Sequence, residues 1–330
     1  MPEDNATTGV LIVHLGTPDA PTPEALRRYL AEFLSDRRVI QTPRLIWWPI
    51  LHGIILRTRP KKSAELYARV WDRKRNDSPL RVIAEDQVVA LRARMTDAPL
   101  EIDYGMRYGK PSIHVRMQAM VEKGIEDIVV VPLYPQYSES TTESVKDAVT
   151  ASLAKQTPAP RVHYVPPYYE HPQYIGAIAD SVRQALAGLD HAPEVVLVSF
   201  HGIPQKYADK GDPYPQQCER TTALLREALG MDAQQLELVY QSRFGPAAWL
   251  QPYADKRVEA LAESGIKRIA VVTPGFSVDC LETIDEIGVE LSETFEEAGG
   301  EQFTFIPCLN ESPAAIELIE TLVRDQLPGS

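Results

Sequence analysis

Two residues whose side chains handle metal ions and protons stand near the ends of apolar runs in the second half of this 330-residue chain. His201 ends the run that starts at Val195, and Glu282 follows the run 269–276. Short β-branched runs closed by Gly or Pro are typical of buried parallel strands. Ligands of open α/β sheets bind beyond the carboxyl ends of such strands. An imidazole and a carboxylate there suit either a divalent metal ion or proton transfer near neutral pH.

A row of carboxylates begins at the second of these residues. Glu282, Glu286 and Glu290 are spaced four residues apart, which places them on one face of a helix. Most such rows are only solvated helix faces, but this one starts directly after a strand exit. It could therefore carry protons or cations between solvent and a metal site. A local π-helical turn would align the three side chains more closely.

The strands that must position these residues belong to a pattern that occurs twice in the chain. The segment 124–132 resembles 265–273, and the segment 10–18 resembles 196–204. In each half a strand is followed by helices and then by a Gly-Ile pair that leads into a second strand. This order predicts an α/β fold made of two related doubly wound units.

We expect two domains that meet in a proline-rich loop. The first covers residues 1–157 and the second covers 158–330. A helix pattern at about 313–327 could pack back on the first domain. The first half has the longer connection between its matched strands, and the extra residues fall at about 21–77.

An apolar segment within this insertion has basic residues on both sides. Its central residues are Trp47, Trp48, Ile50 and Leu51. Apolar residues edged by basic ones suit a surface lip that grips an apolar ligand or touches anionic lipid. The alternative is an ordinary core helix, and the sequence favours neither interpretation over the other.

The composition excludes several classes of protein. Acidic residues outnumber basic ones, 46 to 34, so the net charge of −12 argues against a nucleic-acid partner. The three cysteines are an odd number without paired spacing, which is typical of a reducing compartment. Neither a signal peptide nor an apolar stretch of about 20 residues is visible. We expect a cytoplasmic protein that at most touches a membrane surface, as a monomer or a homodimer.

Several short motifs, in order along nearly the whole chain, make the sequence resemble the ferrochelatases. These enzymes insert ferrous iron into a porphyrin at the end of haem synthesis. The motifs are LGTP at 15–18, YPQYS at 134–138, SFHGIP at 199–204, GDPYP at 211–215, QSRFG at 241–245, WL at 249–250 and DCLET at 279–283. Any one of them is weak evidence, whereas the ordered set is specific.

The resemblance implies two Rossmann-like domains with the porphyrin in the cleft between them. It implies that His201 and Glu282 face each other across the macrocycle centre, as metal ligands and as catalytic groups together with Glu286. Which of the two binds the metal and which takes protons stays open. Glu286 and Glu290 would then form a path for protons or metal.

The family motifs also imply which residues line the porphyrin site. Leu15 and Tyr137 match wall positions of the family, and Arg107 and Tyr108 match as well. Arg107 could pair with a propionate of the substrate. Cys280 stands where some members of the family have a second histidine.

The activity implied is that of a lyase of porphyrin and haem biosynthesis. It would insert Fe²⁺ into protoporphyrin IX to give protohaem, with release of two pyrrole protons and without an organic cofactor. Other members carry a 2Fe–2S cluster on a cysteine-rich tail, but residues 310–330 contain no cysteine, so we expect none here. The alternatives are a chelatase for coproporphyrin III or for cobalt, and a carrier without turnover. An apolar lip favours protoporphyrin, and the carboxylate row favours turnover.

Overall fold

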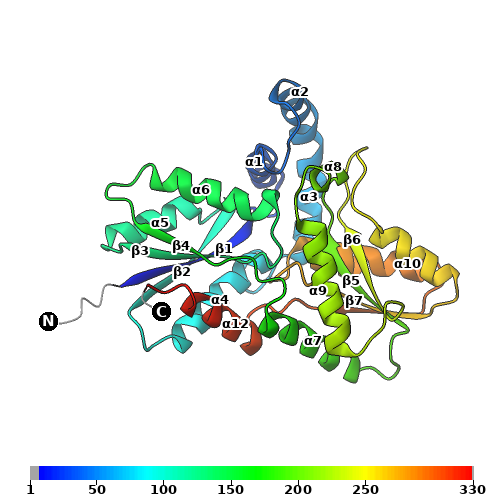
Figure 1. Ribbon diagram of the computed structural model, residues 1–330. Helices are drawn as coiled ribbons and strands as arrows, with labels where there is room; N and C mark the ends of the chain where they lie inside the picture. Colours follow the sequence, from blue (N-terminus) through cyan, green and yellow to red (C-terminus); the bar gives the residue numbers. More distant parts are fainter. Residues whose placement is uncertain (1–6, 329–330) are drawn as a thin grey trace. The chain divides into compact units, whose positions relative to one another are not determined.

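The computed structural model describes residues 7–328 (Figure 1). Its contacts group the chain into two compact units. The first unit contains the chain up to residue 133, residues 139–166 and the chain from 316 onward, and the second contains residues 134–138 and 167–315.

A parallel four-stranded sheet forms the centre of the first unit. Its strands lie in the order β2-β1-β3-β4. They are β1 (Thr8–Thr17), β2 (Leu100–Gly109), β3 (Asp127–Pro132) and β4 (Arg161–Tyr164). Residues 10–13 of β1 are fully buried, because strands covered on both faces are apolar throughout. One face carries α4 (Pro79–Arg94), and the other carries α5 (Ile113–Glu122) and α6 (Ser144–Leu153), which follows the π-helix η2 (Glu139–Glu143) (Figure 1).

The second unit repeats this plan, which confirms the α/β fold of two related sheets flanked by helices. Its parallel strands lie in the order β6-β5-β7-β8, so the first strand of each unit is an inner strand. The strands are β5 (Val195–His201), β6 (Leu236–Gln241), β7 (Arg268–Val272) and β8 (Gln302–Ile306). The helices are α7 (Pro172–Ala187), α8 (Gln205–Ala208), α9 (Tyr214–Leu229), α10 (Ala254–Glu263), the π-helix η3 (Glu282–Leu291) and α11 (Ser292–Glu297).

One face of the second sheet fixes the helix that carries the carboxylate row. Leu197 of β5 and Val271 of β7 are fully buried in a cluster with Ile287 of η3 and Phe295 of α11. Burying a large apolar side chain stabilises a fold by about 1.5–3 kcal/mol. The apolar side of η3 is therefore held on the sheet.

The first unit continues past residue 157 and includes most of the last helix. The boundary expected at residue 157 falls inside this unit, because β4 beyond it pairs with β3. The last helix, α12 (Pro313–Arg324), belongs to the first unit from residue 316 onward. There Arg94 pairs with Glu320, and Arg324 lies 2.8 Å from Asp97. No helix within residues 7–328 is long and apolar enough to cross a bilayer.

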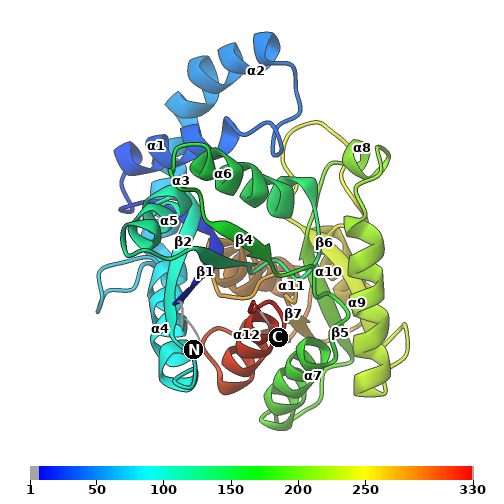
Figure 2. The ribbon, with the colours of Figure 1, turned by 60° about the vertical axis from the view of Figure 1, so that its left-hand side comes forward.

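The insertion at about 21–77 is helical. It consists of α1 (Pro23–Leu34), α2 (Arg44–Ile50), the π-helix η1 (Leu51–Ile55) and α3 (Leu56–Val70). Within the first unit, α2 is the part that stands farthest from the sheet (Figures 1 and 2).

The apolar lip residues divide into a buried and an exposed set. Trp47 and Leu51 are buried in a cluster with Leu34 and Leu56, and the indole Nε1 of Trp47 donates to the Leu34 carbonyl at 2.7 Å. The lip expectation is therefore wrong for Trp47 and Leu51, and Ile50 packs against their cluster. Trp48, in contrast, is 41% exposed.

The two tryptophans should differ sharply in their effect on stability. Trp47→Ala removes a buried ring from the insertion and is expected to lower the free energy of unfolding by about 3–5 kcal/mol. Trp48→Ala, the neighbouring control, should lower it by less than about 1 kcal/mol. Thermal unfolding followed by circular dichroism measures both, and equal losses of stability in the two variants would contradict this division.

Candidate functional site

The site begins where two neighbouring strands of the second sheet end. His201 is the last residue of β5 and Gln241 the last of β6, and the two are partners in register. The chain leaves β5 through Gly202, whose N–H donates to the Gln241 carbonyl at 2.8 Å. A Cβ at position 202 would lie 3.0 Å from that carbonyl oxygen, so only glycine fits comfortably.

The imidazole of His201 has a defined tautomer. Its Nδ1 lies 2.6 Å from the carbonyl oxygen of Gly202, which can only accept. Nδ1 therefore carries the proton in the neutral ring, and the lone pair is on Nε2. The ring is partly exposed, with the ring of Phe276 centred 6.4 Å away. Nε2 is the atom that can accept a proton or bind a metal ion.

The carboxylate row lies on one helical element, as its spacing predicted, and this element is the π-helix η3. Its hydrogen bonds run from i to i+5, so each turn is wider than in an α-helix and residues four apart align more closely. Glu282 and Glu286 are partly buried, and Glu290 is exposed. The row therefore leads from the interior of the second unit to its surface.

Asp279 anchors the start of this helix. Its Oδ1 accepts from the Thr283 hydroxyl at 2.9 Å and from the Cys308 N–H at 3.2 Å, while its Oδ2 accepts from the Asn310 amide at 2.7 Å. The fixed helix start determines the position of Glu282.

Gln241, the last residue of β6, and Ser242, which follows it, hydrogen-bond the row on η3. The Gln241 side chain accepts from the Ser199 hydroxyl at 2.8 Å and donates to the backbone carbonyl of Glu282 at 2.8 Å. Ser242 donates to Glu286 from its backbone N–H at 2.6 Å and from its hydroxyl at 2.5 Å. Both residues belong to the QSRFG motif at 241–245, but the sequence alone predicted no role for them. Their position at the end of an apolar run was the available signal.

The three predicted catalytic side chains share one electrostatic environment. Burial raises the pKa of Glu286, and the negative charge of Glu282 raises it further. The hydrogen bonds of Ser242 and the charge of His201 oppose that rise. Geometry links the three residues through Gln241, which is the register partner of His201, donates to the Glu282 carbonyl and lies 3.5 Å from a Glu286 oxygen. Burial also raises the pKa of the Cys280 thiol, with Glu282 adding to the effect, so Cys280 is held as a neutral thiol.

Two of the predicted porphyrin-wall residues hydrogen-bond Asp36 in the first unit. The guanidinium of Arg107 donates to Asp36 at 2.5 Å and to the Ser144 hydroxyl at 2.6 Å. Tyr108 is fully buried, and its hydroxyl donates to Asp36 at 2.7 Å. Because Tyr108 is buried, the expectation that it contacts substrate is wrong. Arg107 is already paired with the Asp36 carboxylate, and its contact with a propionate stays a prediction.

The other two wall residues keep accessible surface. Leu15 is partly exposed near the end of β1. Tyr137 is partly exposed in the second unit, where its backbone N–H donates to the Gln217 side chain at 2.6 Å. Both could contact a ligand, and their role in substrate binding stays a prediction.

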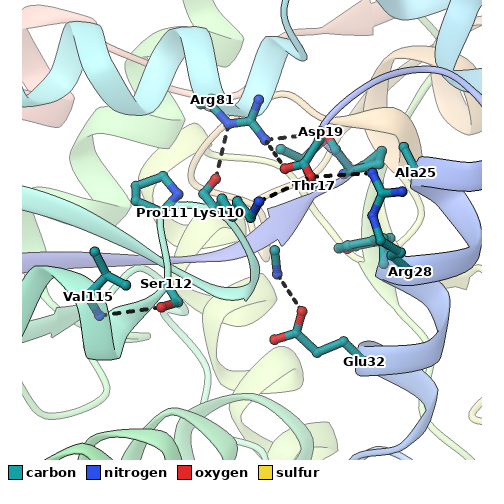
Figure 3. A pocket seen from close by; sticks show the side chains of 13 residues that line it. Thr17, Asp19, Ala25, Arg28, Glu32, Arg81, Lys110, Pro111, Ser112 and Val115 are labelled. Carbon is teal, nitrogen blue, oxygen red and sulfur yellow. Dashed lines mark hydrogen bonds and ion pairs between the residues drawn. The ribbon is translucent and has the colours of Figure 1, made fainter.

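A cavity of about 780 Å³ in the first unit contains none of the predicted site residues (Figure 3). Asp19 lines it and pairs with three other lining residues, Arg28, Arg81 and Lys110, at 3.6, 4.0 and 3.9 Å. Glu32 accepts from a backbone N–H at 2.9 Å. The wall has three basic side chains (Arg28, Arg81 and Lys110) against two acidic ones (Asp19 and Glu32), so the net charge it offers to a ligand is small.

Within residues 7–328, no group of three or more His, Cys, Asp or Glu side chains could hold a metal ion.

Comparison with known proteins places the chain in a family. A family model described as ferrochelatase matches residues 7–327. The chain belongs to the ferrochelatase family. A ferrochelatase of Brucella anthropi is 53% identical over 322 residues, covering 97% of this chain and 92% of the relative, and one of Brucella ovis is 52% identical with the same coverage.

Solved structures of lower identity show the same fold. SirB from Bacillus subtilis with Fe³⁺ has a TM-score of 0.56 at 13% identity and covers 98% of this chain and 96% of its own. The sirohydrochlorin chelatase SirB from Bacillus subtilis subspecies spizizenii in complex with cobalt also has a TM-score of 0.56, at 12% identity, and covers 97% and 95%. At these identities the likeness concerns the fold alone.

The carboxylate row should show a graded effect on turnover. Glu282→Gln is expected to lower kcat most, Glu286→Gln less and Glu290→Gln least, because the row runs from the partly buried Glu282 and Glu286 to the exposed Glu290. Steady-state rates of metal insertion at saturating porphyrin measure the series. Small and equal effects at all three positions would identify the row as an ordinary solvated helix face.

Proposed function

We propose that this chain is an enzyme that inserts Fe²⁺ into protoporphyrin IX to give protohaem. The observation that supports this proposal is the arrangement around Gln241 at the carboxyl edge of the second sheet: His201, with its Nε2 lone pair, is the register partner of Gln241, and the Gln241 amide donates to the backbone carbonyl of Glu282 at 2.8 Å. Membership of the ferrochelatase family supports the reaction. Iron and porphyrin are both substrates, and no organic cofactor takes part.

The residue types fit what the reaction demands. Two pyrrole N–H bonds break, their protons leave, and the four ring nitrogens bind the metal. The neutral imidazole of His201 can take one proton on Nε2, or ligate the metal there, and Glu282 can perform the other task. The porphyrin nitrogens supply the ligands that the protein pair lacks. Glu286 and the exposed Glu290 then offer a route for protons or metal between the site and solvent.

Protoporphyrin is the preferred ring because the first unit carries an exposed apolar patch. The patch consists of Leu45, Ile46, Trp48 and Ile54, which are 92, 58, 41 and 58% exposed. A poorly soluble ring with two carboxylates suits such a surface better than coproporphyrin III, which has four. A cobalt chelatase and a porphyrin carrier remain the alternatives.

The same patch supports peripheral contact with a membrane from the cytoplasmic side. Basic residues of α3, including Arg57, Lys61 and Lys62, are exposed close to it in the chain. Apolar side chains beside basic ones bind anionic lipid surfaces. Co-sedimentation with anionic vesicles tests this contact: Trp48→Ala should weaken binding, and unchanged binding would argue against it.

Metal insertion into defined porphyrins tests the proposed function directly. Under anaerobic conditions the wild-type protein should convert protoporphyrin IX and Fe²⁺ to protohaem faster than it converts coproporphyrin III. His201→Ala should lose nearly all turnover while keeping its circular dichroism spectrum and melting temperature, because it removes the neutral base. Faster turnover of coproporphyrin III would support the alternative substrate, and near-wild-type turnover by a folded His201→Ala protein would remove His201 from the mechanism.

We also propose that the protein holds no iron–sulfur cluster. Such clusters are typically held by four protein ligands, usually cysteines, and the chain has only Cys218, Cys280 and Cys308. All three thiols are buried, and burial raises their pKa. Iron and acid-labile sulfide assays on anaerobically purified protein should find neither in stoichiometric amount. Both present at stoichiometric levels, with visible absorbance after desalting, would overturn this proposal.

A further inference from the structure

Ser242 has an unusual backbone conformation beside the candidate site. Within residues 7–328 only three residues other than glycine have positive φ: Asn76 at 51°, Ser242 at 66° and Asn310 at 52°. Asparagine enters the left-handed region readily, whereas serine does so rarely. Such a conformation costs about 1–3 kcal/mol and persists only where its surroundings hold it.

In this conformation Ser242 donates hydrogen bonds to both carboxylate oxygens of Glu286. The Ser242 N–H donates to Oε1 of Glu286 at 2.6 Å, and the Ser242 hydroxyl donates to Oε2 at 2.5 Å. Hydrogen bonds to an ionised acceptor are the short, strong kind. The Gln241 amide, 3.5 Å from Oε2, adds a weaker contact.

We infer that Ser242 is a positioning residue for metal insertion, which acts by fixing the Glu286 carboxylate beside Glu282 and His201. Because Ser242 donates to both Glu286 oxygens, it holds the carboxylate in one orientation, in which Glu286 can accept a proton. This role rests on the proposed function. The strained, left-handed backbone of Ser242 accompanies its two hydrogen bonds to Glu286.

The variant Ser242→Gly separates the hydroxyl from the backbone. Glycine adopts positive φ freely, so the fold and the N–H contact to Oε1 are kept while the contact to Oε2 is lost. A hydrogen bond to a charged group is worth about tenfold or more in rate when its loss misplaces a reacting group. We expect kcat to fall by at least about tenfold, with the KM for protoporphyrin changed less than about twofold. Asn76→Gly, an exposed position in the first unit with similar φ, is the matched control and should leave both constants unchanged.

A double-mutant cycle with Glu286→Gln distinguishes action through Glu286 from a merely structural role. If Ser242 acts through Glu286, then Ser242→Gly should change kcat less than about twofold in the Glu286→Gln background. Wild-type kcat in Ser242→Gly, or a full further loss in the Glu286→Gln background, would overturn the inference while wild-type activity still supports the proposed function.

A crystal structure of Ser242→Gly decides the positioning even if the wild-type protein inserts no iron. The Glu286 carboxylate is expected to rotate away from its present place or to show two orientations. An unchanged, singly oriented carboxylate would overturn the inference whatever the activity. Absence of wild-type turnover with a rotated carboxylate would count against the proposed function alone.

Discussion

The geometry of the candidate site depends on one buried amide. Gln241 ends β6 in register with His201 at the end of β5, and its side chain spans from the Ser199 hydroxyl to the backbone carbonyl of Glu282. It is only 4% exposed, so an unmade hydrogen bond there would cost about 1–3 kcal/mol. The sheet edge and the carboxylate helix are therefore tied together by a group that has no low-cost alternative partner.

The π-helix is the second element of this arrangement. Runs of π-helix are rare and are often found at functional sites. Here η3 is held at its start by Asp279 and along its apolar side by Ile287 and Leu291 in the sheet cluster. Its wider turn stacks the carboxylates into a line while its other face stays in the core. Ser242 then fixes one member of that line, so strand ends and helix together define the place of each acidic group.

Much of this could be predicted from the sequence, because the relevant signals are local. The β-branched runs predicted both sheets, and the four-residue spacing predicted the row on η3. Arg107 shows why other residues could not be placed: its partner Asp36 lies 71 residues away and meets it only after folding. Trp47 and Trp48 have the same residue type in adjacent positions, yet the packing of a single helix buries one and exposes the other. The positive φ of Ser242 likewise could not be predicted from its residue type, because serine rarely adopts it. It accompanies the two hydrogen bonds to Glu286.

The central proposal is that Nε2 of His201 and the carboxylate of Glu282 receive the metal at this site, one as its ligand and the other as a proton acceptor. Crystals soaked with Zn²⁺, a divalent stand-in for ferrous iron, and measured at the zinc absorption edge test it most directly. One anomalous peak is expected about 2.0–2.2 Å from Nε2 or from a Glu282 oxygen, with Glu286 still bound to Ser242. A peak ligated by Glu286 or Cys280 and by neither His201 nor Glu282 would contradict the proposal.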